Sequence, residues 1–148
     1  MEKGNSIINA VKRLERAGSE HSRATQKLYE AAREVASLIE AQVPAGVKLP
    51  RGYYVKEICS NVGCADFLCI KIPLEYAGTQ HYEETRYIDG IGRYLHGDFH
   101  CWVPGQDRAT VLKFAEDIAD GLLDEIAEWL EARAAKAEQA AEVLENAK

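Results

Sequence analysis

The hydrophobic period of this chain changes twice, and that change constrains the fold more than any other sequence feature. Apolar residues in about the first 43 positions recur every three to four residues, as on one face of an amphipathic helix. Between residues 53 and 103 apolar and polar residues alternate with a period of two, which is typical of strands. After residue 107 the helical period returns. This order predicts an α+β fold in one domain, residues 1–148.

The first segment, residues 1–43, is predicted to be a long helical arm. Its apolar positions keep one heptad phase and fall on Ile7, Val11, Leu14, Leu28, Ala32, Val35 and Ile39. The middle of this seam is weak, because the same phase places Gly18, His21 and Thr25 there. The arm is either one helix or two, and we expect a break or kink at Gly18, since glycine costs about 1 kcal/mol against alanine inside a helix.

The middle segment, residues 53–103, is predicted to be a central antiparallel meander of four or five short strands. Tyr53 and Val55 alternate with Tyr54 and Lys56, and similar alternation continues to residue 103. Asp89-Gly90 is the strongest hairpin signal in the chain, because Asp-Gly suits the tight turns that join paired strands.

The last segment, residues 107–147, is predicted to be one long helix. At 1.5 Å per residue it would be roughly 60 Å long, whereas a compact chain of this size has a radius of gyration of about 15 Å. Such a helix must project beyond its own domain, and its distal apolar positions, Ala137, Ala141 and Leu144, then need a partner. We therefore expect a homo-oligomer, with a dimer as the first hypothesis.

Charge and composition narrow the classes of function. The formal net charge of −6 argues against a direct nucleic-acid binder. Its distribution is uneven, since residues 109–148 hold 10 acidic and 4 basic residues, whereas residues 1–49 hold 6 and 8. No segment is apolar enough to cross a membrane or to serve as a signal peptide, so we expect a cytoplasmic protein with four reduced thiols and no cofactor.

Aromatic and basic side chains are interleaved from residue 76 to residue 113. Tyrosine and tryptophan rings beside guanidinium groups suit a small anion with a flat ring, such as a nucleotide. The alternative is that these are ordinary strand residues and solvated ion pairs. The residues expected to bind such a ligand are Arg86, Arg93, Arg108, Tyr82, Tyr87, Tyr94 and Trp102.

Two further groups of residues could carry chemistry. His96, Asp98 and His100 include a carboxylate that could orient a histidine as a general base, although residues two apart on a strand commonly just face water. Cys59 and Cys64, with His96, His100 or Cys101, could hold zinc, although the four-residue gap lacks a matching second cysteine pair. Buried free cysteines explain the same pattern.

Three functions follow from these features. The first is a non-enzymatic, oligomeric binding protein that holds a small anionic, nucleotide-like ligand near the sheet or a subunit interface. The second is an acidic protein-interaction or inhibitor module, of the kind found on mobile elements, that engages a basic partner through the last helix. The third is a hydrolase that uses His96, Asp98 and His100 or a metal. We rank binding above catalysis, because no nucleophile–base pair is recognisable.

Overall fold

A computed structural model of the chain describes residues 2–60, 63–76, 80–88, 91–96, 99–105 and 108–148, with side chains for residues 4–59, 63–71, 85–88 and 108–148. It is an α+β fold, as the change of period predicts. The elements in chain order are α1 (Glu2–Gln42), a 3₁₀ turn η1 (Pro50–Gly52), β1 (Tyr53–Ser60), β2 (Gly63–Tyr76), β3 (Gln80–Tyr87), β4 (Ile91–His96), β5 (Phe99–Gly105), α2 (Arg108–Ala119) and α3 (Leu122–Asn146).

The first arm is one unbroken helix, so the expected break at Gly18 was wrong. A Cβ at Gly18 would meet nothing within 4 Å, and Ala17, Gly18 and Ser19 are all exposed. The cost of about 1 kcal/mol for one glycine is too small to interrupt a helix whose turns on both sides are regular. The C-terminal part of α1 packs on the domain through Ala32, Ala36 and Ile39, and Val43, just after the helix, joins the same core.

The central sheet has three antiparallel strands in the order β1-β2-β3, so the expected four or five strands were too many. β4 and β5 pair with each other in a separate two-stranded sheet, with a register irregularity between Ile91 and Arg93. The proposed turn at Asp89-Gly90 lies outside the described residues. Hydrophobic alternation identifies strands, but pairing depends on turn geometry and contacts between distant residues, which alternation does not encode.

The two faces of the central sheet have different neighbours. On one face Tyr53, Val55, Leu68, Ile70 and Ile88 join the main core with residues of α1, α2 and α3. The opposite face carries a smaller cluster around Phe67, Cys69 and Tyr87. At the edge of the main core, Glu40 of α1 accepts a hydrogen bond of 2.7 Å from the backbone N–H of Leu68. Side chains that alternate along the strands therefore face two different clusters, the main core on one face of the sheet and the smaller cluster on the other.

The predicted long C-terminal helix is present as α3, but the last arm is divided, so the expectation that one unbroken helix covers residues 107–147 was wrong in its extent. Gly121 lies between α2 and α3 with a φ of 97°, which glycine adopts more readily than any residue with a Cβ. The turn lets Val111 and Phe114 of α2 and Leu122 and Ile126 of α3 all enter the main core. One straight helix could not bring residues from both α2 and α3 into the core over the central three-stranded sheet.

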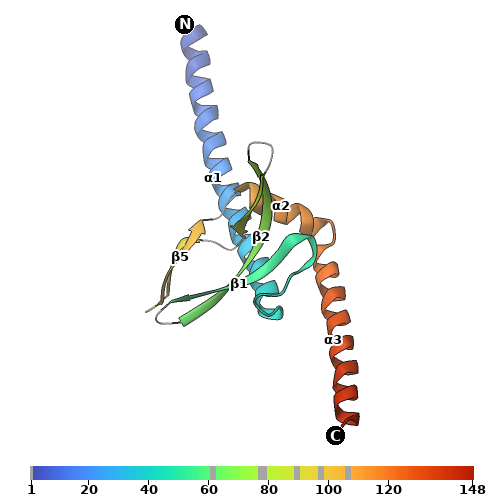
Figure 1. Ribbon diagram of the computed structural model, residues 1–148. Helices are drawn as coiled ribbons and strands as arrows, with labels where there is room; N and C mark the ends of the chain where they lie inside the picture. The colour runs from blue at the N-terminus through green and yellow to red at the C-terminus, as the bar shows by residue number, and fades with distance from the viewer. Residues whose placement is uncertain (1, 61–62, 77–79, 89–90, 97–98, 106–107) are drawn as a thin grey trace.

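The molecule is elongated because the two helical arms leave the domain in opposite directions. Figure 1 shows the N-terminal part of α1 and the C-terminal part of α3 extending from opposite sides, with the chain termini at the two extremes. Both free ends expose large apolar side chains, including Leu14 (72% exposed) on α1 and Leu144 (68% exposed) on α3. None of the helices, over the described residues, combines the length and apolar character needed to cross a membrane.

Candidate functional site

The residues predicted to bind an anionic ligand are spread over four elements. Tyr82, Arg86 and Tyr87 lie on β3, Arg93 and Tyr94 on β4, Trp102 on β5 and Arg108 at the start of α2. The register of the small sheet places Arg93 opposite Trp102. The side chains of Tyr82, Arg93, Tyr94 and Trp102 lie outside the described residues, so their role stays a prediction.

The remaining three predicted ligand residues do not converge. Arg86 is paired with Ile70, whose side chain belongs to the main core. Its neighbour Tyr87 is buried on the opposite face of the sheet, with its ring edge-on to Phe67 at 6.4 Å. Arg108 is exposed, and its Nη1 lies 2.9 Å from Nε2 of a histidine on α1, His21. The structure therefore links Arg108 to the first arm and not to the other two residues.

The predicted catalytic group falls on the small sheet. His96 ends β4 opposite Phe99, and His100 pairs with Leu95. Asp98 and the side chains of both histidines lie outside the described residues, so a catalytic role for them stays a prediction. Cys101, a weak metal candidate, pairs with Tyr94, and its side chain is likewise outside the described part.

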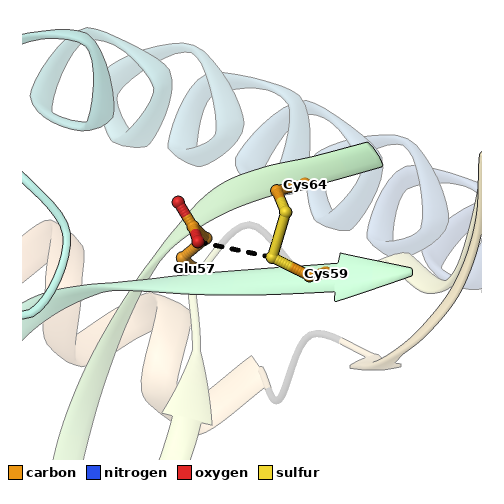
Figure 2. A group of neighbouring side chains, drawn as sticks. All are labelled: Glu57, Cys59 and Cys64. Atoms are coloured by element: carbon orange, nitrogen blue, oxygen red, sulfur yellow. Dashed lines mark hydrogen bonds between the residues drawn. A yellow bond between two sulfur atoms is a disulfide. The ribbon is translucent and has the colours of Figure 1, made fainter. Parts of the chain in front are cut away.

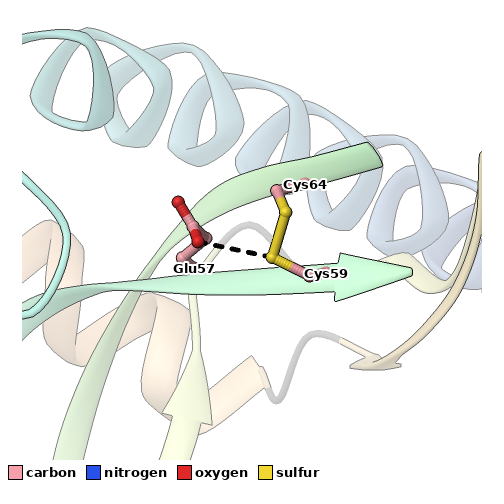
Figure 3. The surroundings of a disulfide bond; sticks show 3 residues. All are labelled: Glu57, Cys59 and Cys64. Carbon is pink, nitrogen blue, oxygen red and sulfur yellow. Dashed lines mark hydrogen bonds between the residues drawn. A yellow bond between two sulfur atoms is a disulfide. The ribbon is translucent and has the colours of Figure 1, made fainter. Parts of the chain in front are cut away.

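The cysteines differ from the expected four reduced thiols. Cys59 and Cys64 are joined by a disulfide across the β1–β2 hairpin (Figure 3). They occupy directly opposed positions in the strand register, and this brings their side chains together on one face. Cys69 is free and buried, and burial raises the pKa of its thiol to about 11. Cys69 is therefore protonated at neutral pH and is a poor nucleophile.

An acidic side chain lies beside the disulfide. Figure 2 shows Glu57 pointing toward the Cys59–Cys64 bond, and Glu57 Oε1 lies 3.3 Å from Cys59 Sγ. A disulfide sulfur carries no proton, so this contact becomes an S–H···O hydrogen bond only when the cysteines are reduced. The ligand atoms of Glu57, Cys59 and Cys64 all lie within 4.8 Å of one another, and all three residues are exposed. Asp66 is paired with Glu57 in the strand register.

A basic groove lies at the start of β1, over the face of the sheet that carries the smaller cluster. We call it the Tyr54 groove. Two adjoining hollows, of about 520 and 640 Å³, share Gly46, Tyr54 and Lys71. Lys71 Nζ lies 5.6 Å from the centre of the Tyr54 ring, and the Tyr54 hydroxyl is 2.7 Å from Thr85 Oγ1. Lys48 lines one hollow, and Lys56 with Glu57 lines the other.

The Tyr54 hydroxyl stays neutral over the physiological pH range. Burial, with smaller contributions from its neighbours, raises its pKa to about 12. The groove therefore presents one neutral ring and three ammonium groups, on Lys48, Lys56 and Lys71, to solvent, with the acidic residue Glu57 beside Lys56. Such a surface favours small anions, because lysine is a flexible donor to phosphate and carboxylate oxygens.

Among the described residues, several charged side chains gather around Arg51 in a cluster that we call the clasp. Arg51 donates two hydrogen bonds to the Glu125 carboxylate, at 2.8 and 2.7 Å, and one of 3.2 Å to Asp117. It also donates to the backbone carbonyl of Asp120, the residue before the bend between α2 and α3. These contacts fix the loop before β1 to that bend, so we assign the clasp to stability and not to ligand binding.

Comparison with known proteins gives no relative: neither a protein-family model nor a curated protein nor a solved structure matches the chain.

Sequence reasoning missed the residues that the structure brings together. Tyr54 and Lys71 are neighbours only because β1 and β2 pair in one register. Glu57 and Asp66 could have been found, since each is two residues from a cysteine and strand alternation places it on the same face. The predicted zinc site combined Cys59 and Cys64 only with histidines and a further cysteine, and it included no carboxylate.

Proposed function

We propose that the protein is a non-enzymatic, self-assembling binding protein whose copies join through the two helical arms. The observation that carries this proposal is the run of exposed apolar side chains on the free part of α1. Ile7, Ile8, Val11 and Leu14 are between 47% and 72% exposed. Ile7, Val11 and Leu14 share the heptad phase of Ala32 and Ile39, which are buried in the same helix, so the unburied stripe continues the core-facing side.

The occupant proposed for this stripe is the α3 arm of a second copy. Residues 2–27 contain six basic and three acidic residues, whereas α3 contains seven acidic and two basic residues. The opposite net charges favour contact between a first arm and a last arm over contact between two like arms. Val143 and Leu144, both 68% exposed, supply the apolar side of that contact.

The shape of the molecule allows both arms to pair at once. Because the arms leave the domain in opposite directions (Figure 1), a twofold axis places each first arm antiparallel to the other copy's last arm. This arrangement gives two equivalent contacts and closes the assembly at a dimer.

Sedimentation of the whole chain at low micromolar concentration tests this proposal. We expect the wild type to sediment as a dimer and Leu14→Asp to sediment as a monomer with unchanged helical circular dichroism. Leu38→Asp is the matched control, since Leu38 lies on the same helix and is 65% exposed beside the domain. A monomeric wild type would reject self-assembly and favour the acidic last arm as a surface for a basic partner protein.

A second candidate function is the binding of a small anion with a flat ring in the Tyr54 groove. The specific observation is the position of Lys71 over the Tyr54 ring, with Lys48 and Lys56 lining the same groove. Ammonium groups suit a phosphate or carboxylate, and the aromatic ring offers a stacking surface. This candidate keeps the ligand class of the first sequence hypothesis and a position near the sheet, but it relies on different residues.

Calorimetric titration with a mononucleotide and with inorganic phosphate tests the second candidate. We expect the mononucleotide to bind more tightly than phosphate, and Lys71→Ala to weaken binding about tenfold, as the loss of one charge-assisted contact would. Lys136→Ala, on the distant α3 arm, should bind normally. Absence of heat with either ligand, or equal loss in both variants, would reject the groove as an anion site.

A further inference from the structure

The end of the β1–β2 hairpin carries four side chains that can bind metal ions on one face of the sheet. In the strand register Cys59 opposes Cys64 and Glu57 opposes Asp66. Opposed residues of antiparallel strands share a face, and so do residues two apart on one strand. The four side chains therefore form a block of two sulfurs and two carboxylates, and all four residues are exposed.

The disulfide in this block is open to reduction. A reduced dithiol in solution can reach it, because both cysteines are exposed. A thiolate of that dithiol attacks one cysteine sulfur, the Cys59–Cys64 bond breaks, and the other sulfur leaves as a thiolate that takes up a proton. The second thiol of the reagent then attacks the mixed disulfide and releases the second cysteine. The reagent is oxidised to its own disulfide, and the protein gains two thiols.

We propose that the reduced hairpin end is a binding site for a thiophilic divalent cation, with Zn²⁺ as the probe. The thiols of Cys59 and Cys64 lose their protons to the solvent as they bind, and Glu57 supplies a carboxylate oxygen. Asp66 is the fourth ligand, next to Glu57 on the paired strand. Two thiolates and two carboxylates match the charge and the ligand types that zinc accepts in a tetrahedral site.

The geometry requires only small movements of Glu57, Cys59 and Cys64, whereas Asp66 lies outside this close group and must turn its side chain toward it. Ligands that surround zinc tetrahedrally at about 2.0 to 2.3 Å lie roughly 3.5 Å apart. The ligand atoms of Glu57, Cys59 and Cys64 are already within 4.8 Å of one another, held by the rigid pairing of two strands. Figure 2 shows the Glu57 carboxylate and both sulfurs on the same side of the strands. Rotation about side-chain bonds after reduction is sufficient to open a central position for the ion.

The same residues make metal binding depend on the redox state. A two-electron oxidant that joins the two thiolates as a disulfide removes two of the four ligands and releases the ion. In the reverse reaction a dithiol supplies two electrons, reduces the Cys59–Cys64 disulfide and restores the two thiol ligands. Metal occupancy therefore follows the thiol–disulfide balance of the surroundings. The proposed metal site does not involve the arms, and Glu57 is the residue that it shares with the lining of the Tyr54 groove.

The test uses the full chain, reduced with a phosphine that does not chelate metal, and titrated with Zn²⁺ against a chromogenic chelator without oxygen. We expect one equivalent of Zn²⁺ to bind to the reduced protein and none to the oxidised protein. The two forms share one sequence, so this comparison is not affected by misfolding of a variant. Co²⁺ in place of Zn²⁺ should give the near-ultraviolet absorption of thiolate–cobalt bonds, which a site made only of carboxylates cannot produce.

Variants identify the ligands. Cys59→Ser should abolish tight binding, and Glu57→Gln and Asp66→Asn should each weaken it at least tenfold, with Asp124→Asn as an exposed control. Cys101→Ser should bind normally, because Cys101 is not in the block. Failure of the reduced wild type to bind Zn²⁺, or unchanged binding in the Cys59→Ser variant, would overturn the proposal. If Cys101→Ser weakened Zn²⁺ binding and Asp66→Asn did not, Cys101 would be the fourth ligand and the assignment of Asp66 would be overturned.

Discussion

Arg51 shows how one residue can link two distant parts of this chain. It has a φ of 61°, a left-handed conformation that costs a non-glycine residue about 1 kcal/mol. Its guanidinium contacts Glu125, Asp117 and Asp120 more than sixty residues away, and these contacts hold the backbone in that conformation. Asp117 connects Arg51 to two further residues, since it also accepts hydrogen bonds from Tyr53 at 2.6 Å and from Lys113 at 2.8 Å.

The ionisation of Asp117 is coupled to folding through these bonds. Burial opposes the charged carboxylate, but the hydrogen bonds from Lys113, Tyr53 and Arg51 outweigh it and lower the pKa of Asp117. Hydrogen bonds from Arg51 likewise lower the pKa of Glu125. A folded-state pKa below the unfolded value stabilises the fold fully above the unfolded pKa, and that stabilisation is lost as the pH falls through the folded pKa.

We predict that Asp117→Asn lowers the free energy of unfolding at pH 7 by about 2 kcal/mol, because three donors lose a charged acceptor in a half-buried site. The loss should shrink as the pH falls below about 4, because the carboxylate of the unfolded chain then takes up a proton while the folded one, with its lowered pKa, is still charged. Urea unfolding at several pH values measures both effects. The exposed Asp124→Asn serves as the control, and an equal pH response in the two variants would contradict the coupling.

At the scale of elements, two glycines inside helical patterns behave in opposite ways. Gly18 lies in a continuous helix, whereas Gly121 ends one helix and precedes another with a φ of 97°. The sequence favoured a break at Gly18 because the seam there lacks apolar residues. The actual break is set by tertiary contacts: Leu122 and Ile126 enter the core beyond the bend, and Arg51 binds Asp120 just before it. Local pattern could not contain this information.

Substituting alanine at each glycine should therefore have opposite effects. Gly121→Ala should destabilise the domain by about 1 kcal/mol through backbone strain alone, since a Cβ there meets nothing within 4 Å. Gly18→Ala should strengthen the first arm by about 0.5–1 kcal/mol, because helix propensity rises without a clash. Chemical denaturation measures the first effect, and amide hydrogen exchange in residues 10–26 measures the second. The same sign in both variants would show that helix propensity dominates at both positions.

The strands show the same division between what a sequence encodes and what it does not. Alternation in Tyr53, Val55 and their neighbours predicted that this segment forms strands, because side chains on a strand alternate between its two faces. The number of strands in the sheet was wrong, since β4 pairs with β5 and not with β3. For the candidate sites, Cys59 and Cys64 were recognised as a pair, but their carboxylate neighbours required the register.

At the scale of the whole molecule, two copies can pair their arms in two ways: each first arm with the partner's last arm, or like arms with each other. The domain buries the half of each seam that lies next to the sheet and leaves the distal half exposed on both arms. Sequence reasoning predicted that the ends would project, because an amphipathic segment so long exceeds the size of a compact domain. It could not predict their opposite directions, which depend on the bend at Gly121 and on how α1 packs (Figure 1).

Mixing two defective variants distinguishes the arrangements of the proposed dimer. If each first arm contacts the partner's last arm, Leu14→Asp damages both contacts of its own homodimer, and so does Leu144→Asp. A heterodimer of the two variants places both damaged arms in one contact and leaves the other contact intact, so the mixture should dimerise more tightly than either variant alone. If like arms pair, every contact in the heterodimer contains one damaged arm, and mixing gives no recovery. Sedimentation velocity of the mixture, with one variant fluorescently labelled, measures the difference, and absence of recovery would contradict the antiparallel arrangement that opposite arm charges favour.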